Sequence, residues 1–115
     1  MNKKLIITVR VNEYMSRDIN KNVPFTPDEI AETAAECRAA GASIIHFHAR
    51  NSDGGKCHTP EVYAEIVAKI REKCDILIDS TLGQITVNED ENRLAHIKLM
   101  GQHSKTRPDF AAVDT

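Results

Sequence analysis

Two histidines spaced two residues apart are the strongest chemical signal in this sequence. His46 and His48 follow Ile44 and Ile45, in a segment that is typical of a buried β-strand. In a strand, residues i and i+2 point to the same face, so both imidazoles project together. Two imidazoles on one face suit a divalent metal such as zinc, and a catalytic zinc has about three protein ligands and one open position. The pair therefore predicts a metal site that needs a third ligand from elsewhere.

Polar side chains also stand at the ends of the other predicted strands. Because parallel α/β folds place their sites at the carboxyl ends of strands, we expect these residues to surround one site. They are Glu13 after the first strand, Arg50 after the histidine pair, Ser80 and Thr81 at the end of the third strand, and Asp114 near the end of the fourth. Asp79 has the opposite parity from Ser80, which favours a helix-capping role for Asp79 over a role at the site, although the second stays open.

The remaining histidines carry weaker signals. Cys57 and His58 are adjacent in a predicted loop and could together bind a metal or form an activated thiol. No further potential metal ligand lies near Cys57 and His58 in the sequence, so we expect them to be ordinary loop residues. His96, in a predicted helix, and His103, in a polar loop, are expected to be solvated.

Strand and helix patterns alternate along the chain and predict a single α/β domain over residues 1–115. A strand followed by a helix, repeated, indicates right-handed βαβ crossovers and a parallel sheet. Two architectures fit this pattern: an open doubly wound sheet, or a TIM (β/α)8 barrel of which this chain would form roughly the first half. No glycine-rich phosphate loop occurs, which disfavours the nucleotide-binding doubly wound folds. The predicted strands lie near residues 5–11, 43–50, 75–80 and 110–114, and the helices near 27–40, 60–73 and 89–100.

Two of these helices have recognisable starts. Thr26 can cap the first, Pro27 suits its first position, and Glu29 can complete a capping box. The segment that begins at Thr59 and Pro60 repeats the same device for the second helix.

Composition narrows the class of protein. The 28% of charged residues and 41% of hydrophobic residues are ordinary for a soluble domain, and the net charge of −2 disfavours a nucleic-acid partner. The short apolar run at residues 5–7 predicts neither a signal core nor a membrane segment. Three cysteines without CxxC spacing argue against a disulfide framework and favour a cytoplasmic location.

Four segments, taken in order, resemble a known family. They are IITV at 6–9, TPDEIAE at 26–32, AGASIIHFHAR at 40–50 and STLG at 80–83. Together they resemble the β-keto acid cleavage enzymes, the group of 3-keto-5-aminohexanoate cleavage enzyme. The resemblance implies a zinc-dependent (β/α)8 barrel of more than twice this length, typically a tetramer. Such enzymes condense a β-keto acid with acetyl-CoA and cleave the product to acetoacetate and a new acyl-CoA.

The resemblance also implies roles for individual residues. His46 and His48 correspond to two zinc ligands, while Glu13, Arg50 and Ser80 correspond to residues that we expect to bind substrate. The glutamate that completes the zinc site, and the arginine and aspartate that assist proton removal, are implied to lie on later strands. The 115-residue chain is therefore expected to be inactive alone, and to form a homo-oligomer or be completed by a C-terminal half.

Two other functions remain open at this point. A metal-dependent hydrolase barrel also uses an HxH pair, although in the amidohydrolase type that pair usually follows the first strand. A non-catalytic remnant, or a small metal-binding α/β domain that folds through oligomerisation, is the other interpretation. Metal content and oligomeric state would separate these possibilities.

Overall fold

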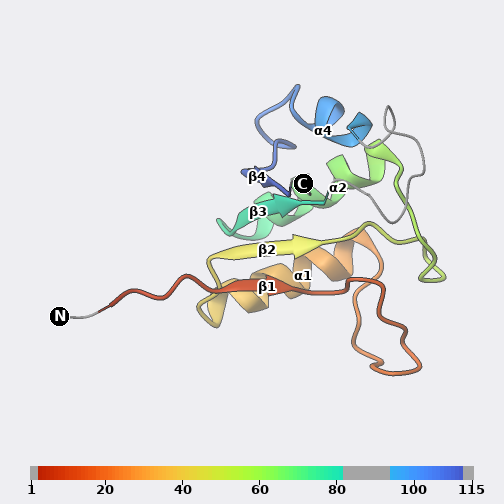
Figure 1. Cartoon of the computed structure of the whole chain (residues 1–115), viewed down its shortest axis with the longest axis horizontal. Helices are drawn as coiled ribbons and strands as arrows, with labels where there is room; N and C mark the ends of the chain where they lie inside the picture. Colours follow the sequence, from red (N-terminus) through yellow and green to blue (C-terminus); the bar gives the residue numbers. More distant parts are fainter. Residues whose placement is uncertain (1–2, 82–93, 113–115) are drawn as a thin grey trace.

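The computed structural model describes residues 3–81 and 94–112 of the chain. Its four parallel strands lie side by side in the order in which they occur in the sequence (Figure 1). They are β1 (Thr8–Arg10), β2 (Ile44–Phe47), β3 (Leu77–Ser80) and β4 (Phe110–Ala111). The described helices are α1 (Pro27–Ala39), α2 (Pro60–Lys73) and α4 (Ala95–Met100). The expected α/β fold of parallel (β/α) units is confirmed, and it is consistent with the first half of a TIM barrel.

The strands are shorter than the apolar runs that predicted them. Leu5 and Ile6 belong to the first run, yet they precede β1 and are 80% and 72% exposed. Hydrophobic character alone does not make a strand, because the backbone also needs a neighbour with which to pair. Of the predicted helix near 89–100, residues 89–93 lie outside the described residues, as do residues 113 and 114 of the predicted fourth strand.

The start of α1 has the predicted capping box. The Thr26 hydroxyl accepts a hydrogen bond from the Glu29 backbone N–H at 3.2 Å, and the Glu29 carboxylate accepts from the Thr26 N–H at 2.9 Å. Caps of this kind contribute about 1 kcal/mol. α2 also begins with a proline, but Thr59 makes no side-chain cap bond. None of the helices in the described ranges is both long and apolar enough to cross a membrane.

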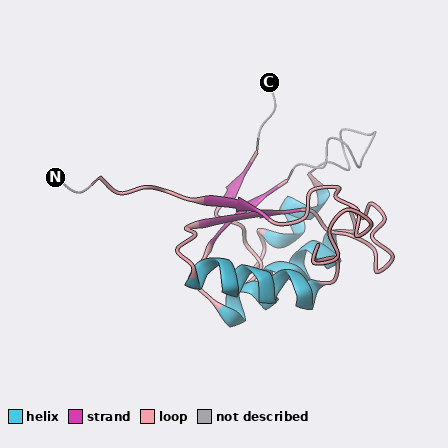
Figure 2. Cartoon of the chain, turned by 90° about the horizontal axis from the view of Figure 1, so that it is seen from below, coloured by secondary structure: helices cyan, strands magenta, loops and turns pink. Residues whose placement is uncertain are grey.

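The described helices all cover the same face of the sheet (Figure 2). Ile45 and Phe47 point toward them and pack, fully buried, in a core that includes Ile30 of α1. Burial of each such side chain stabilises the fold by roughly 1.5–3 kcal/mol. Side chains alternate along a strand, so His46 and His48 must point to the opposite face. No helix of the described residues covers that face. The core therefore sets the direction of the histidines.

Candidate metal centre

The structure brings His46 and His48 together at the carboxyl end of β2. Their Nε2 atoms are 3.3 Å apart, and each residue is 6% exposed. Both residues are therefore held almost out of solvent, with one ring nitrogen of each turned toward the other.

Glu13 joins the two histidines in a group of three potential ligands. Its Oε2 lies 3.2 Å from Nε2 of His48, and one ligand atom from each residue of the group lies within 4.8 Å of the others. Two ligand atoms of a tetrahedral zinc lie roughly 3.3 Å apart, because zinc–nitrogen bonds are about 2.0 Å long. The nitrogen–nitrogen and nitrogen–oxygen spacings of this group therefore fit a zinc-sized cation.

The electrostatic surroundings of His48 favour the neutral imidazole. Burial lowers the pKa of His48; the Glu13 carboxylate opposes this shift, and the nearby His46 ring adds to it. Metal binding requires a neutral imidazole, because a protonated ring nitrogen has no lone pair to donate. Glu13 supplies a negative charge that a divalent cation would partly neutralise.

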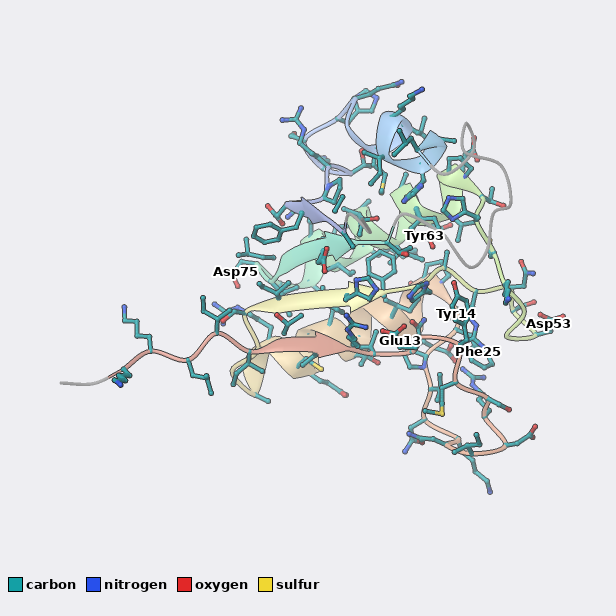
Figure 3. All side chains as sticks on the ribbon, in the orientation of Figure 1. Glu13, Tyr14, Phe25, Asp53, Tyr63 and Asp75 are labelled. Atoms are coloured by element: carbon teal, nitrogen blue, oxygen red, sulfur yellow. The ribbon has the colours of Figure 1, made fainter. Side chains whose placement is uncertain are left out.

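Glu13 reaches the histidines because the chain changes direction at this residue. It shares the parity of Val9 and Val11, which pack against the core on the helix side of the sheet. Parity alone would therefore direct its carboxylate away from the histidines. Its φ of 40° lies instead in the left-handed region, which costs a non-glycine residue about 1–2 kcal/mol. In Figure 3, Glu13 lies near the end of the sheet toward which β1 and β2 run.

Arg50 holds the loop that carries Glu13. Its Nε, Nη1 and Nη2 atoms donate to the backbone carbonyls of Gly54, Glu13 and Met15 at 2.7, 3.0 and 3.1 Å. The guanidinium carbon also lies 4.6 Å from the centre of the Phe25 ring, and Arg50 is 7% exposed. The sequence predicted a substrate contact for Arg50, whereas the structure engages all three of its nitrogens with the backbone of two loops.

The sheet register corrects the predicted facing of Asp79 and Ser80. His46 is paired with Asp79, and Phe47 with Ser80. Ser80 therefore points with Phe47 toward the helices, is fully buried, and donates to the Thr81 carbonyl at 3.4 Å, so the structure does not bring it to the histidines. Asp79 does face them, and its Oδ2 lies 3.3 Å from Nδ1 of His46. Sequence spacing shows that Asp79 and Ser80 point to opposite faces of the sheet. Only the pairing of β3 with β2 shows which of the two faces the histidines.

His96 is buried rather than solvated as predicted. It is fully inaccessible, its Nε2 contacts the carbonyl oxygen of Thr81 at 2.5 Å, and its ring lies 4.4 and 4.6 Å from those of His58 and Tyr63. Burial lowers the pKa of His96 to about 4, so the ring is neutral near pH 7 and donates its Nε2 proton to that carbonyl. The burial of His96 was not predicted from the sequence, because the apolar pattern around this residue is weak.

The adjacent Cys57 and His58 do not join this group. Cys57 is buried, and among the described residues neither it nor His58 belongs to the group of potential metal ligands. Asp114 lies outside the described residues.

The sequence of this chain matches known proteins over almost its whole length. A model of the beta-keto acid cleavage enzyme family matches residues 4–115. The chain belongs to that family. The resemblance drawn from the four sequence segments is thereby confirmed, and the histidine pair lies within the matched region.

Curated relatives within the beta-keto acid cleavage enzyme family are considerably longer. The 3-keto-5-aminohexanoate cleavage enzyme of Fusobacterium nucleatum is 35% identical over 116 residues, covering 99% of this chain and 40% of that protein. The enzyme of the same name from Acetoanaerobium sticklandii is 34% identical over 114 residues, covering 97% and 39%. The 3,5-dioxohexanoate:acetyl-CoA acetone transferase of Paraburkholderia graminis is 34% identical over 83 residues, covering 70% and 27%. The chain thus spans about 40% of the length of the first two relatives.

Proposed function

We propose that this chain forms the metal-binding part of a zinc-dependent β-keto acid cleavage enzyme, which converts a β-keto acid and acetyl-CoA to acetoacetate and a new acyl-CoA. The observation that supports this most is the group of Glu13, His46 and His48 at the carboxyl end of parallel strands, in a chain of this family. Family members are metal-dependent in general. The names of the relatives support the substrate class.

In this proposal His46 and His48 bind the zinc, and Glu13 is either the third ligand or the acid that faces the substrate. When bound, zinc supplies a Lewis acid that polarises the keto oxygen and stabilises developing negative charge. The chain itself contributes a pair of buried imidazoles and a carboxylate positioned by the loop after β1. We assign the base that removes the proton to a part of the protein outside this sequence.

The helix-free face of the sheet supports completion by further structure. Leu77 pairs with Ile44 and Phe110 with Asp79, so both lie on the histidine side, where they are 41% and 49% exposed. Parallel sheets are normally covered on both faces. We propose that further strand–helix units of the same protein cover this face, and that assembly of several copies is the alternative.

The test measures zinc affinity by chelator competition, and acetoacetate formation from a β-keto acid and acetyl-CoA, in the protein that carries this sequence. His46→Ala and His48→Ala are expected to weaken zinc binding by more than about 100-fold, because each removes a direct ligand. Both variants should also abolish acetoacetate formation. His103→Ala is the matched control, because His103 is exposed and should alter neither quantity.

Three outcomes would contradict the proposal in different ways. Unchanged zinc affinity in both histidine variants would show that the group is not the metal site. Zinc binding with hydrolysis, and without acetoacetate, would favour a metal-dependent hydrolase. Zinc binding without any turnover would favour a non-catalytic metal-binding domain.

A further inference from the structure

Asp79 contacts the ring nitrogen of His46 that faces away from His48. Asp79 Oδ2 is 3.3 Å from Nδ1 of His46, whereas Nε2 of the same ring faces Nε2 of His48. The contact follows from the sheet itself, because His46 and Asp79 are register partners on neighbouring central strands. Two rigid strands therefore hold the carboxylate and the imidazole at this separation.

The contact determines which nitrogen of His46 carries the proton. An ionised carboxylate only accepts hydrogen bonds, so Nδ1 must donate to Asp79. In a neutral ring this leaves Nε2 without a proton and with its lone pair directed toward His48 and the metal group. Asp79 therefore stabilises the one tautomer of His46 that can bind a cation at Nε2.

No carboxylate accepts a hydrogen bond from Nδ1 of His48 among the described residues. Its Nδ1 is buried and has no hydrogen-bond partner among the described residues, and the ring centre lies 4.7 Å from that of Tyr14. Its Nε2 lies 3.2 Å from the Glu13 carboxylate, which favours a proton on that nitrogen when no metal is bound. The two histidines thus differ, since only His46 has its proton held away from the metal group.

We propose that Asp79 is a positioning residue for His46, which it holds in the Nδ1–H tautomer and in the ring orientation needed to bind a metal at Nε2. The zinc-binding part of this inference rests on the proposed function; the tautomer part does not. Carboxylates that accept a hydrogen bond from a metal-binding imidazole raise its basicity, and their loss weakens metal binding by about 10- to 100-fold.

The first experiment determines the His46 tautomer in the metal-free protein from the nitrogen-15 chemical shifts of its ring. The native protein should show a protonated Nδ1 and an unprotonated Nε2. Asp79→Leu, which removes the acceptor but keeps the bulk, and Asp79→Ala should both move the proton toward Nε2. Asp75→Asn is the matched control, because Asp75 is exposed and lies at the opposite end of β3, paired with Arg38 (Figure 3).

The second experiment measures zinc affinity of the same variants by chelator competition. Both Asp79 variants should bind zinc about 10- to 100-fold more weakly than the native protein, while Asp75→Asn should match it. An unchanged His46 tautomer in both Asp79 variants would overturn the inference. Unchanged zinc affinity in both, where His46→Ala does weaken zinc binding, would overturn its zinc-binding part. If His46→Ala does not weaken zinc binding, the proposed metal site is wrong, and the tautomer measurement still tests whether Asp79 positions His46.

Discussion

The Nη1 atom of Arg50 donates a 3.0 Å hydrogen bond to the carbonyl oxygen of Glu13, a residue 37 positions earlier in the chain. That carbonyl belongs to the residue with a φ of 40°, whose carboxylate contacts His48. Arg50 therefore holds the backbone of Glu13, the third potential metal ligand. A residue of the β2–α2 loop thus shapes the metal group without contacting a metal.

Replacing Arg50 should weaken both the fold and the metal group. Arg50→Met leaves three backbone carbonyls without their donor, which should lower the free energy of unfolding by about 2–3 kcal/mol. Release of the Glu13 loop should also weaken zinc binding by about 10-fold. Urea unfolding and zinc titration measure the two effects. Arg38→Met is the control, because Arg38 makes an exposed ion pair with Asp75. Native zinc affinity in Arg50→Met would contradict the positioning role.

Two substitutions at Glu13 separate its backbone from its carboxylate. Glu13→Ala and Glu13→Gly both remove the carboxylate, so the two variants should bind zinc with the same affinity. Glycine adopts a positive φ without strain, so Glu13→Gly should be more stable than Glu13→Ala by about 1 kcal/mol. Thermal or urea unfolding gives the comparison. Equal stability of the two variants would show that the left-handed conformation carries no strain.

Ser80→Ala tests whether the Ser80 side chain lies on the helix side of the sheet, as the pairing of β3 with β2 indicates. Ser80 is buried on the helix side and makes one long hydrogen bond, so its loss should change the free energy of unfolding by less than about 1 kcal/mol. Zinc affinity should stay within about twofold of the native value, in contrast to the Asp79 variants. A large loss of zinc binding in Ser80→Ala would mean that the hydroxyl faces the histidines after all.

Protonation of His96 should destabilise the protein in mildly acidic solution. The pKa of His96 is lowered to about 4 in the folded chain, against about 6.5 when unfolded, so the unfolded state binds the proton more readily. The free energy of unfolding should therefore fall as the pH drops from 6.5 to 4, by up to about 3 kcal/mol from this group.

The matched variants for this pH dependence are His96→Asn and His103→Asn. Asparagine at position 96 keeps a donor for the Thr81 carbonyl but does not titrate, so its stability curve should be flatter over this window. The exposed His103 should leave the curve unchanged. Urea unfolding at several pH values measures both, and parallel curves for native and His96→Asn proteins would refute the prediction.

Local patterns in the sequence were enough to predict the order of the described strands and helices, and the histidine pair. The capping residues Thr26 and Glu29 act within one turn, and His46 and His48 share a face because side chains alternate along any strand. These relationships depend on neighbours in the chain, so they can be derived from spacing alone. The family resemblance rests on the same contiguous segments.

Only the tertiary structure decided which other residues join the histidines. The sequence established that Asp79 and Ser80 point to opposite faces, but the pairing of β3 with β2 selected Asp79 for the site. Strand parity alone would direct Glu13 to the helix side, and its carboxylate reaches His48 because its backbone is left-handed and is held by Arg50 from a distant segment. Register and long-range hydrogen bonds join residues far apart in the chain, so no local periodicity could predict them.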